Sequence, residues 1–239
     1  MPLNQELVEY GSKLGWTAFG YSIKRLREWY ELRDVRRVWS PFLGSKEPIG
    51  VVLSTRPGPH LRSTPRLSLN EMLAFSELNI LFHSVGKKVV PRPSDTDLST
   101  LAKENIVVLG GPNANDVAKD LWKLLEPRLP VAFDGPAVQF TVANRAYKPE
   151  YDAAGLVTRD FGVVLRTSNP LFGAEGKRLL MAFGCHGYAT YAVLSSALQK
   201  SFARRVHETV GSKDFVAVLD VRLKGKAVVQ AEVITCMSL

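Results

Sequence analysis

The sequence predicts a three-layer, Rossmann-like α/β domain with a mostly parallel sheet, an antiparallel hairpin at the C-terminal edge and an N-terminal helical extension. Three observations favour this fold class. Aliphatic runs such as residues 106–109 are continuous, as is typical of strands covered on both faces. Turn-forming residues and then a segment of helical spacing follow each run, which is the order of parallel βαβ units. The length of 239 residues also fits one α/β unit.

The N-terminal extension is expected to cover residues 1–45, and the α/β domain residues 46–239. Apolar residues at Ile23, Leu26, Tyr30 and Val35 approximate one stripe of a helix, with charged residues between them. Two interpretations stay open. The stripe either packs on the domain, or it contacts a protein partner or a membrane surface.

The first half of the domain alternates strands and helices. A short strand is expected at residues 49–53 and another at 88–91, separated by a helix that begins at a capping box, Ser68-x-x-Glu71. A short helix from 97 to 103, a strand at 106–109 and a second longer helix follow. Asn113 and Asn115 are expected to include the N-cap of that helix.

The second half of the domain is predicted to begin with antiparallel strands, and a strand followed by a helix comes after them. Residues 138–142 and 161–166 are predicted to form two strands of a hairpin or meander, joined by a polar connection. A strand at 179–183 then leads into a helix that continues to about residue 202. The chain ends with strands at 215–221 and 227–235, whose short polar connection predicts an antiparallel hairpin at the sheet edge.

Composition limits the class of protein without fixing its function. The formal net charge is +8 and the isoelectric point is near 9.5, but the basic residues are scattered. Two cysteines without a CxxC pair exclude a zinc ribbon or a disulfide framework. No signal-peptide pattern or long apolar segment is visible, so we expect a cytoplasmic protein, with peripheral membrane contact left open.

Three loops follow predicted strands and precede predicted helices, at residues 54–56, 110–113 and 184–187. In open parallel sheets ligands bind outside the carboxyl ends of the strands, so these loops are expected to meet at one edge. Asn169 joins them if its strand runs with the parallel set, and otherwise lies in an ordinary turn. The predicted ligand-binding residues are Ser54, Thr55, Arg56, Gly110, Gly111, Asn113, Asn169, Gly184, Gly187 and Thr190.

The loops allow anion binding and, as an alternative, catalysis. Glycines let backbone N–H groups approach an anion closely, although neither GxGxxG nor GxxxxGK[ST] is present. Cys185 precedes a predicted helix and is a candidate nucleophile, with a buried structural thiol as the other interpretation. His186 is a candidate hydrogen-bond donor or acid/base. The four histidines show no metal-binding spacing, so no metal site is predicted, and no cofactor can be named.

These signals lead to three hypotheses about function. The first is a ligand-binding module that recognises an anionic small molecule, such as a nucleotide, at the carboxyl edge of the sheet. The second is a hydrolase or transferase that acts on a nucleotide-like substrate with His186, Cys185 or both. The third is a nucleic-acid-binding protein, which the basic charge suggests but no known nucleic-acid-binding motif supports.

Overall fold

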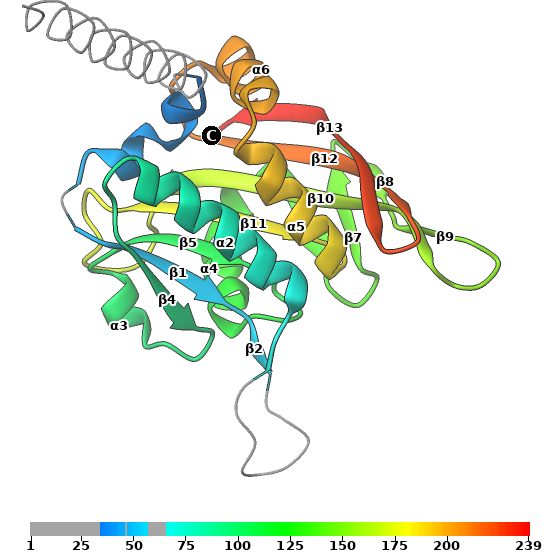
Figure 1. Ribbon diagram of the computed structural model, residues 1–239, viewed down its shortest axis with the longest axis horizontal. Coiled ribbons are helices and arrows are strands. Elements are labelled where there is room, and N and C mark those ends of the chain that lie inside the picture. The colour runs from blue at the N-terminus through cyan, green and yellow to red at the C-terminus, as the bar shows by residue number, and fades with distance from the viewer. Residues whose placement is uncertain (1–33, 46, 57–65) are drawn as a thin grey trace, which may run out of the picture.

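The computed structural model describes residues 34–45, 47–56 and 66–239. Its central sheet has the strand order β13-β12-β10-β11-β5-β1-β4, with β9 paired to β10 (Figure 1). Strands β4, β1, β5 and β11 are parallel, whereas β10, β12 and β13 pair antiparallel. The main strands are β1 (Ile49–Leu53), β4 (Val89–Pro93), β5 (Asn105–Leu109), β9 (Glu150–Tyr151), β10 (Val157–Ser168), β11 (Arg178–Gly184), β12 (Phe215–Lys224) and β13 (Ala227–Ser238). The fold is therefore mixed α/β with a mostly parallel sheet, as predicted.

Helices and a small sheet cover the two faces of the central sheet, which makes three layers. The helices are α2 (Leu69–Ser84), α3 (Leu98–Leu101), α4 (Asp116–Leu125), α5 (Gly187–Ala197) and α6 (Lys200–Val210). One hydrophobic core joins α2, α5 and α6 to the sheet, and the other joins α3 and α4 to its opposite face. Figure 1 shows α2 and α5 side by side across one face.

The described part of the N-terminal extension belongs to the first core. Residues 34–43 are helical, and Val35, Val38, Trp39 and Phe42 are buried there. The Trp39 indole donates to the carbonyl of Ala197 at the end of α5. Ile23, Leu26 and Tyr30, the first half of the predicted stripe, lie outside the described residues. Among the helices that the structure describes, none is both long and apolar enough to cross a membrane.

The middle of the chain departs from the predicted meander. Strand β7 (Gln139–Val142) pairs with β6 (Val131–Asp134) and β8 (Arg145–Tyr147) in a separate sheet, whereas β10 lies in the central sheet. The expectation that these two strands form a hairpin or meander was wrong, because β7 pairs with β6 and β8, whereas β10 pairs with β9, β11 and β12. The helix expected to reach residue 202 divides into α5 and α6. The C-terminal hairpin is confirmed, with β13 at the edge.

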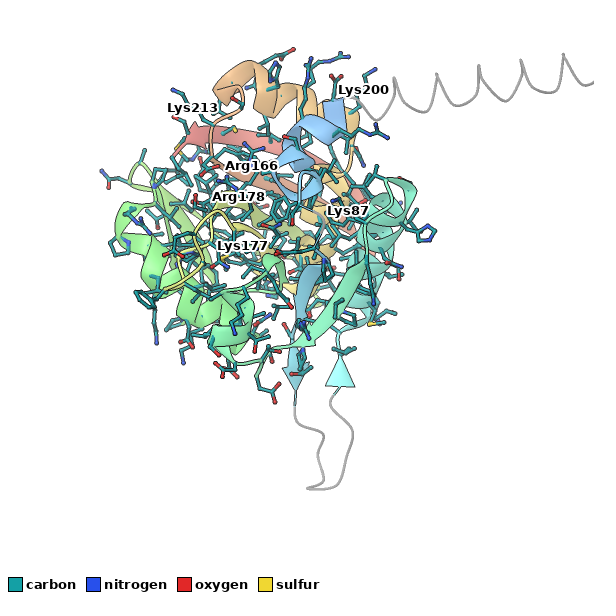
Figure 2. The ribbon with its side chains drawn as sticks, turned by 90° about the vertical axis from the view of Figure 1, so that its left-hand side faces the viewer. Lys87, Arg166, Lys177, Arg178, Lys200 and Lys213 are labelled. Carbon is teal, nitrogen blue, oxygen red and sulfur yellow. The ribbon has the colours of Figure 1, made fainter. Side chains whose placement is uncertain are left out.

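A buried arginine ties three segments together at the amino ends of the parallel strands. Arg166 in β10 is 1% exposed, and its guanidinium donates to the carbonyls of Val38, at 2.8 Å, and Ser212, at 2.9 Å. It also lies 5.0 Å from the centre of the Phe215 ring. Figure 2 shows Arg166 next to Arg178, and both contact Asp214. The N-terminal helical segment and the α6–β12 connection are thus held by one side chain.

Replacing this arginine should destabilise the fold strongly. Arg166→Ala is expected to lower the free energy of unfolding by about 3–5 kcal/mol, because buried carbonyls lose their donor and a large side chain leaves a cavity. Urea unfolding followed by circular dichroism measures the change. The control is Lys213→Ala, an exposed neighbour, with an expected change within about 0.5 kcal/mol. Equal stabilities of the two variants would contradict the assigned role of Arg166.

Candidate functional site

A cavity of about 470 Å³ opens at the carboxyl ends of the parallel strands. It receives residues from the loops after β1, β5 and β11, together with the start of α2 and strand β6. The described residues that line it are Ser54, Leu67, Ser68, Glu71, Gly110, Gly111, Asn113, Ala114, Phe133, Gly184, Cys185, His186, Gly187 and Thr190. The structure thus brings the three predicted loops to one place, while the binding of a ligand there stays a prediction.

The cavity lies where the helical connections divide between the two faces of the sheet. Helix α2, which follows β1, packs in one core, whereas α4, which follows β5, packs in the other. Because β1 and β5 are neighbours, their loops leave in opposite directions and a crevice opens between them. As predicted, Asn115 caps α4: its side-chain oxygen accepts from the backbone N–H of Ala118 at 3.1 Å.

Gly110 allows the close approach of two loops at the floor of the crevice. Its φ angle is +87°, a conformation that residues with a side chain rarely adopt. A Cβ atom at this position would overlap the Ser54 hydroxyl and lie 2.7 Å from Oε1 of Glu71. The glycine is therefore required both by the turn and by the packing of β1 and α2 against it.

A buried carboxylate joins the start of α2 to the end of β1. Glu71 is 4% exposed, and its Oε2 accepts from the backbone N–H of Ser54 at 2.7 Å. The predicted capping box is not formed as expected, because the Ser68 side chain makes no cap hydrogen bond among the described residues. Glu71 accepts the hydrogen bond from Ser54 at the end of β1, and this bond fixes the first turn of α2 at the cavity.

Two helix N-termini face the cavity without side-chain caps. Ser68 caps α2 and His186 caps α5 by position, yet neither side chain accepts a hydrogen bond from its helix. The hydroxyl of Ser54 is buried in the same cavity and has no hydrogen-bond partner in the described part of the chain. Backbone and hydroxyl donors therefore point to a common space, which is the usual composition of an anion site.

His186 is held by a fully buried carboxylate. Nδ1 of its ring lies 3.3 Å from Oδ2 of Asp160, which also accepts from the His186 backbone N–H at 3.0 Å. The Asp160 carboxylate raises the pKa of His186 above its ordinary value, and partial burial only partly opposes this effect. On the other side of the ring, Nε2 lies 3.2 Å from the hydroxyl of Tyr151 in β9. The protonated imidazole is thus favoured inside the cavity.

The surroundings of Cys185 favour its neutral form, whereas those of His186 favour its charged form. Burial raises the pKa of its thiol far above the usual range, and the Asp160 carboxylate raises it further. The thiolate is the reactive form, so this environment keeps Cys185 in its unreactive state near neutral pH. Although Cys185 lines the cavity, the geometry favours the structural interpretation over the nucleophilic one.

Asn169 and Thr55 lie away from the cavity. Asn169 directly follows β10, which is antiparallel to β11, so it lies at the opposite edge and donates to the Leu101 carbonyl at 3.1 Å. Its expected place at the site was therefore wrong. The Thr55 hydroxyl pairs with that of Ser94 at 2.8 Å and does not line the cavity. The Arg56 side chain lies outside the described residues.

Four residues of the site were missed or given another role by the sequence argument. Glu71 was assigned to a cap, whereas Tyr151 and Asp160 belong to the polar connection before the strand predicted at 161–166 and were given no role. Phe133 carried no signal, because its cavity position depends on the separate sheet of β6, β7 and β8. Of these, only Asp160 had a usable signal, an acid directly before the strand predicted at 161–166.

Comparison with protein-family models, with curated proteins and with solved structures found no match. The function must therefore be argued from the cavity itself. Within the described residues, no group of three or more histidine, cysteine, aspartate or glutamate side chains could hold a metal ion.

A pair of glycine substitutions tests the packing at the cavity floor. Gly110 and Gly155 both have positive φ, but a Cβ at Gly155 would meet nothing within 4 Å. Gly155→Ala should cost about 1–2 kcal/mol of unfolding free energy from backbone strain alone. Gly110→Ala should cost at least about 1 kcal/mol more, because of the added overlap. Chemical denaturation measures both values, and equal losses would contradict the close approach.

The electrostatic role of Asp160 can be measured directly. Asp160→Asn should lower the pKa of His186, as followed by NMR of its ring protons, with the signal assigned by its loss in His186→Gln. The groups that face the imidazole are Asp160 from β10, Tyr151 from β9 and Cys185 beside it, with Glu71 from α2 on the same cavity. An unchanged pKa in the Asn variant would contradict the pairing.

The same pair makes stability depend on pH. The raised pKa means that the folded state binds the His186 proton more tightly than the unfolded state, whose pKa is about 6.5. The stabilisation is complete below that value and disappears as the pH rises through the folded-state pKa. The difference in unfolding free energy between wild type and Asp160→Asn should shrink over this interval.

Proposed function

We propose that the cavity binds an anionic small molecule of the nucleotide type. The observation that carries this proposal is the convergence of two uncapped helix N-termini, the Gly110–Gly111 turn and the buried Ser54 hydroxyl on one space. Helix N-termini bind phosphates and carboxylates because their backbone N–H groups lack partners and the helix dipole is positive there. The raised pKa of His186 favours a positive charge at the start of α5.

The apolar wall of the cavity supports a ligand with an aromatic portion. Phe133 lines it, and its ring lies 5.0 Å from that of Phe140 and 5.4 Å from that of Phe183. Leu67 adds a second apolar group. A planar base could stack against this wall while its phosphate lies at the helix N-termini. The volume of about 470 Å³ is also in the range of small-molecule sites.

The topology is a further argument for a Rossmann-like interpretation. Order β4-β1-β5 in the parallel part, with α2 and α4 on opposite faces, corresponds to the doubly wound arrangement of strands 2-1-3. In such sheets the ligand occupies the switch point between strands 1 and 3, which is the place of this cavity. This analogy concerns the place of the ligand, not its identity.

Ligand-induced thermal stabilisation tests the proposal. Inorganic phosphate and a panel of nucleoside mono-, di- and triphosphates should raise the melting temperature of the wild-type protein, because they bind only the folded state. Gly111→Val, which pushes a side chain toward Phe183, and His186→Gln should both reduce the shift. The control is His207→Gln, an exposed histidine on α6, with an undiminished shift expected. If no member of the panel stabilises the wild type, the proposal is overturned.

A further inference from the structure

We propose that the cavity hydrolyses phosphate monoesters of the nucleotide type, with the His186 imidazole as the general acid that protonates the departing ester oxygen. This inference rests on the proposed function, because the phosphate must first bind at the N-termini of α2 and α5. It adds a reaction to that binding site and assigns the proton donor to one nitrogen, Nε2.

The position of His186 in the fold makes this assignment. As the N-cap residue of α5, it lines the cavity and directly precedes in the chain the backbone N–H groups that would hold the phosphate. Its side chain is 31% exposed, whereas its carboxylate partner is fully buried. Asp160 lies on the Nδ1 side, so Nε2, whose partner is the hydroxyl of the exposed Tyr151, is the nitrogen that a ligand can reach by replacing that hydroxyl.

The hydroxyl of Tyr151 marks the direction in which Nε2 makes a hydrogen bond. It lies 3.2 Å from this nitrogen, and the two rings meet edge to face with centroids 5.8 Å apart. Tyr151 belongs to β9 and is 53% exposed. In our proposal an ester oxygen of the substrate replaces this hydroxyl, so that Tyr151 competes with the substrate and donates no proton to it.

The reaction balances with water as the only co-reactant. The oxygen of a water molecule bonds to phosphorus while the bond between phosphorus and the ester oxygen breaks, and its electron pair stays on the ester oxygen. The proton on Nε2 passes to that oxygen and gives the free alcohol. A proton from the attacking water restores the imidazolium, and inorganic phosphate leaves. Because such transition states are loose, protonation of a poor leaving group is the demanding part of the reaction.

Asp160 is a positioning residue in this scheme. Its Oδ1 accepts from the backbone N–H of Phe161 at 2.8 Å, while its Oδ2 accepts from the backbone N–H of His186 at 3.0 Å and lies 3.3 Å from Nδ1 of the ring. The carboxylate therefore fixes the ring orientation and favours the protonated acid. With Asp160→Asn, kcat should fall and the descending limb of its pH profile should move to lower pH, since the acid loses its proton earlier.

The decisive experiment compares two leaving groups with the full-length protein. Nucleoside 5′-monophosphates release an alkoxide that needs a proton, whereas p-nitrophenyl phosphate releases a stable phenolate. His186→Gln should lower kcat by roughly 100-fold or more on the nucleotide but by less than about 10-fold on p-nitrophenyl phosphate. His207→Gln serves as the matched control. Equal losses on both substrates would indicate a structural role and overturn the assignment.

A second variant and a measurement of phosphate release complete the test. Tyr151→Phe should lower KM for the nucleotide, because a competing hydroxyl is gone, whereas a loss of kcat as large as that of His186→Gln would make Tyr151 the donor and overturn the proposal. Nucleotides that stabilise the wild type without release of phosphate would overturn catalysis and leave the binding proposal standing. Neither stabilisation nor turnover would overturn both.

Discussion

The parallel ladder of β1, β5 and β11 determines where this molecule can bind a ligand. Val52 pairs with Val108, and Val108 pairs with Met181, so the three strands end in one row. The loop that follows each strand leaves the sheet at this row, so the three loops lie close together and line one cavity. Glycine at the narrowest point, Gly110, lets the loops after β1 and β5 approach each other closely. The site thus depends on backbone geometry first and on side-chain chemistry second.

The antiparallel direction of β10 explains both why Asn169 does not lie at the cavity and why Asp160 does. Had β10 run with the parallel set, Asn169 at its end would lie at the cavity. Because it runs the other way, its beginning lies there, and Gly162 pairs with Gly184. Asp160 therefore reaches His186, while Asn169 closes the opposite edge. The direction of β10 therefore places the buried carboxylate of Asp160, and not the amide of Asn169, at the site.

Local patterns in the sequence predicted the elements well but not their partners. Aliphatic runs identified β1, β5 and β11, and the loops that follow them were correctly located, since these features depend on neighbouring residues. The pairing of β7 with β6 and the position of Phe133 depend on contacts between distant segments, which no periodicity encodes. The pair of Asp160 and His186 is of the same kind, because 26 positions separate its members. The net charge of +8 suggested nucleic-acid binding, yet no lysine or arginine is among the described residues that line the cavity.

The absence of lysine and arginine among the described cavity residues changes what the net charge of +8 means. Attraction to an anion in this cavity would come from backbone N–H groups, a hydroxyl and one imidazole. Such donors recognise the shape of an anionic group as well as its charge, and salt screens them less than exposed cations. The basic side chains at the other edge, such as Lys177 and Arg178, pair largely with carboxylates. A polyanion binds surfaces with many exposed cations, whereas our proposal of a small anionic ligand rests on the compact set of donors among the described cavity residues.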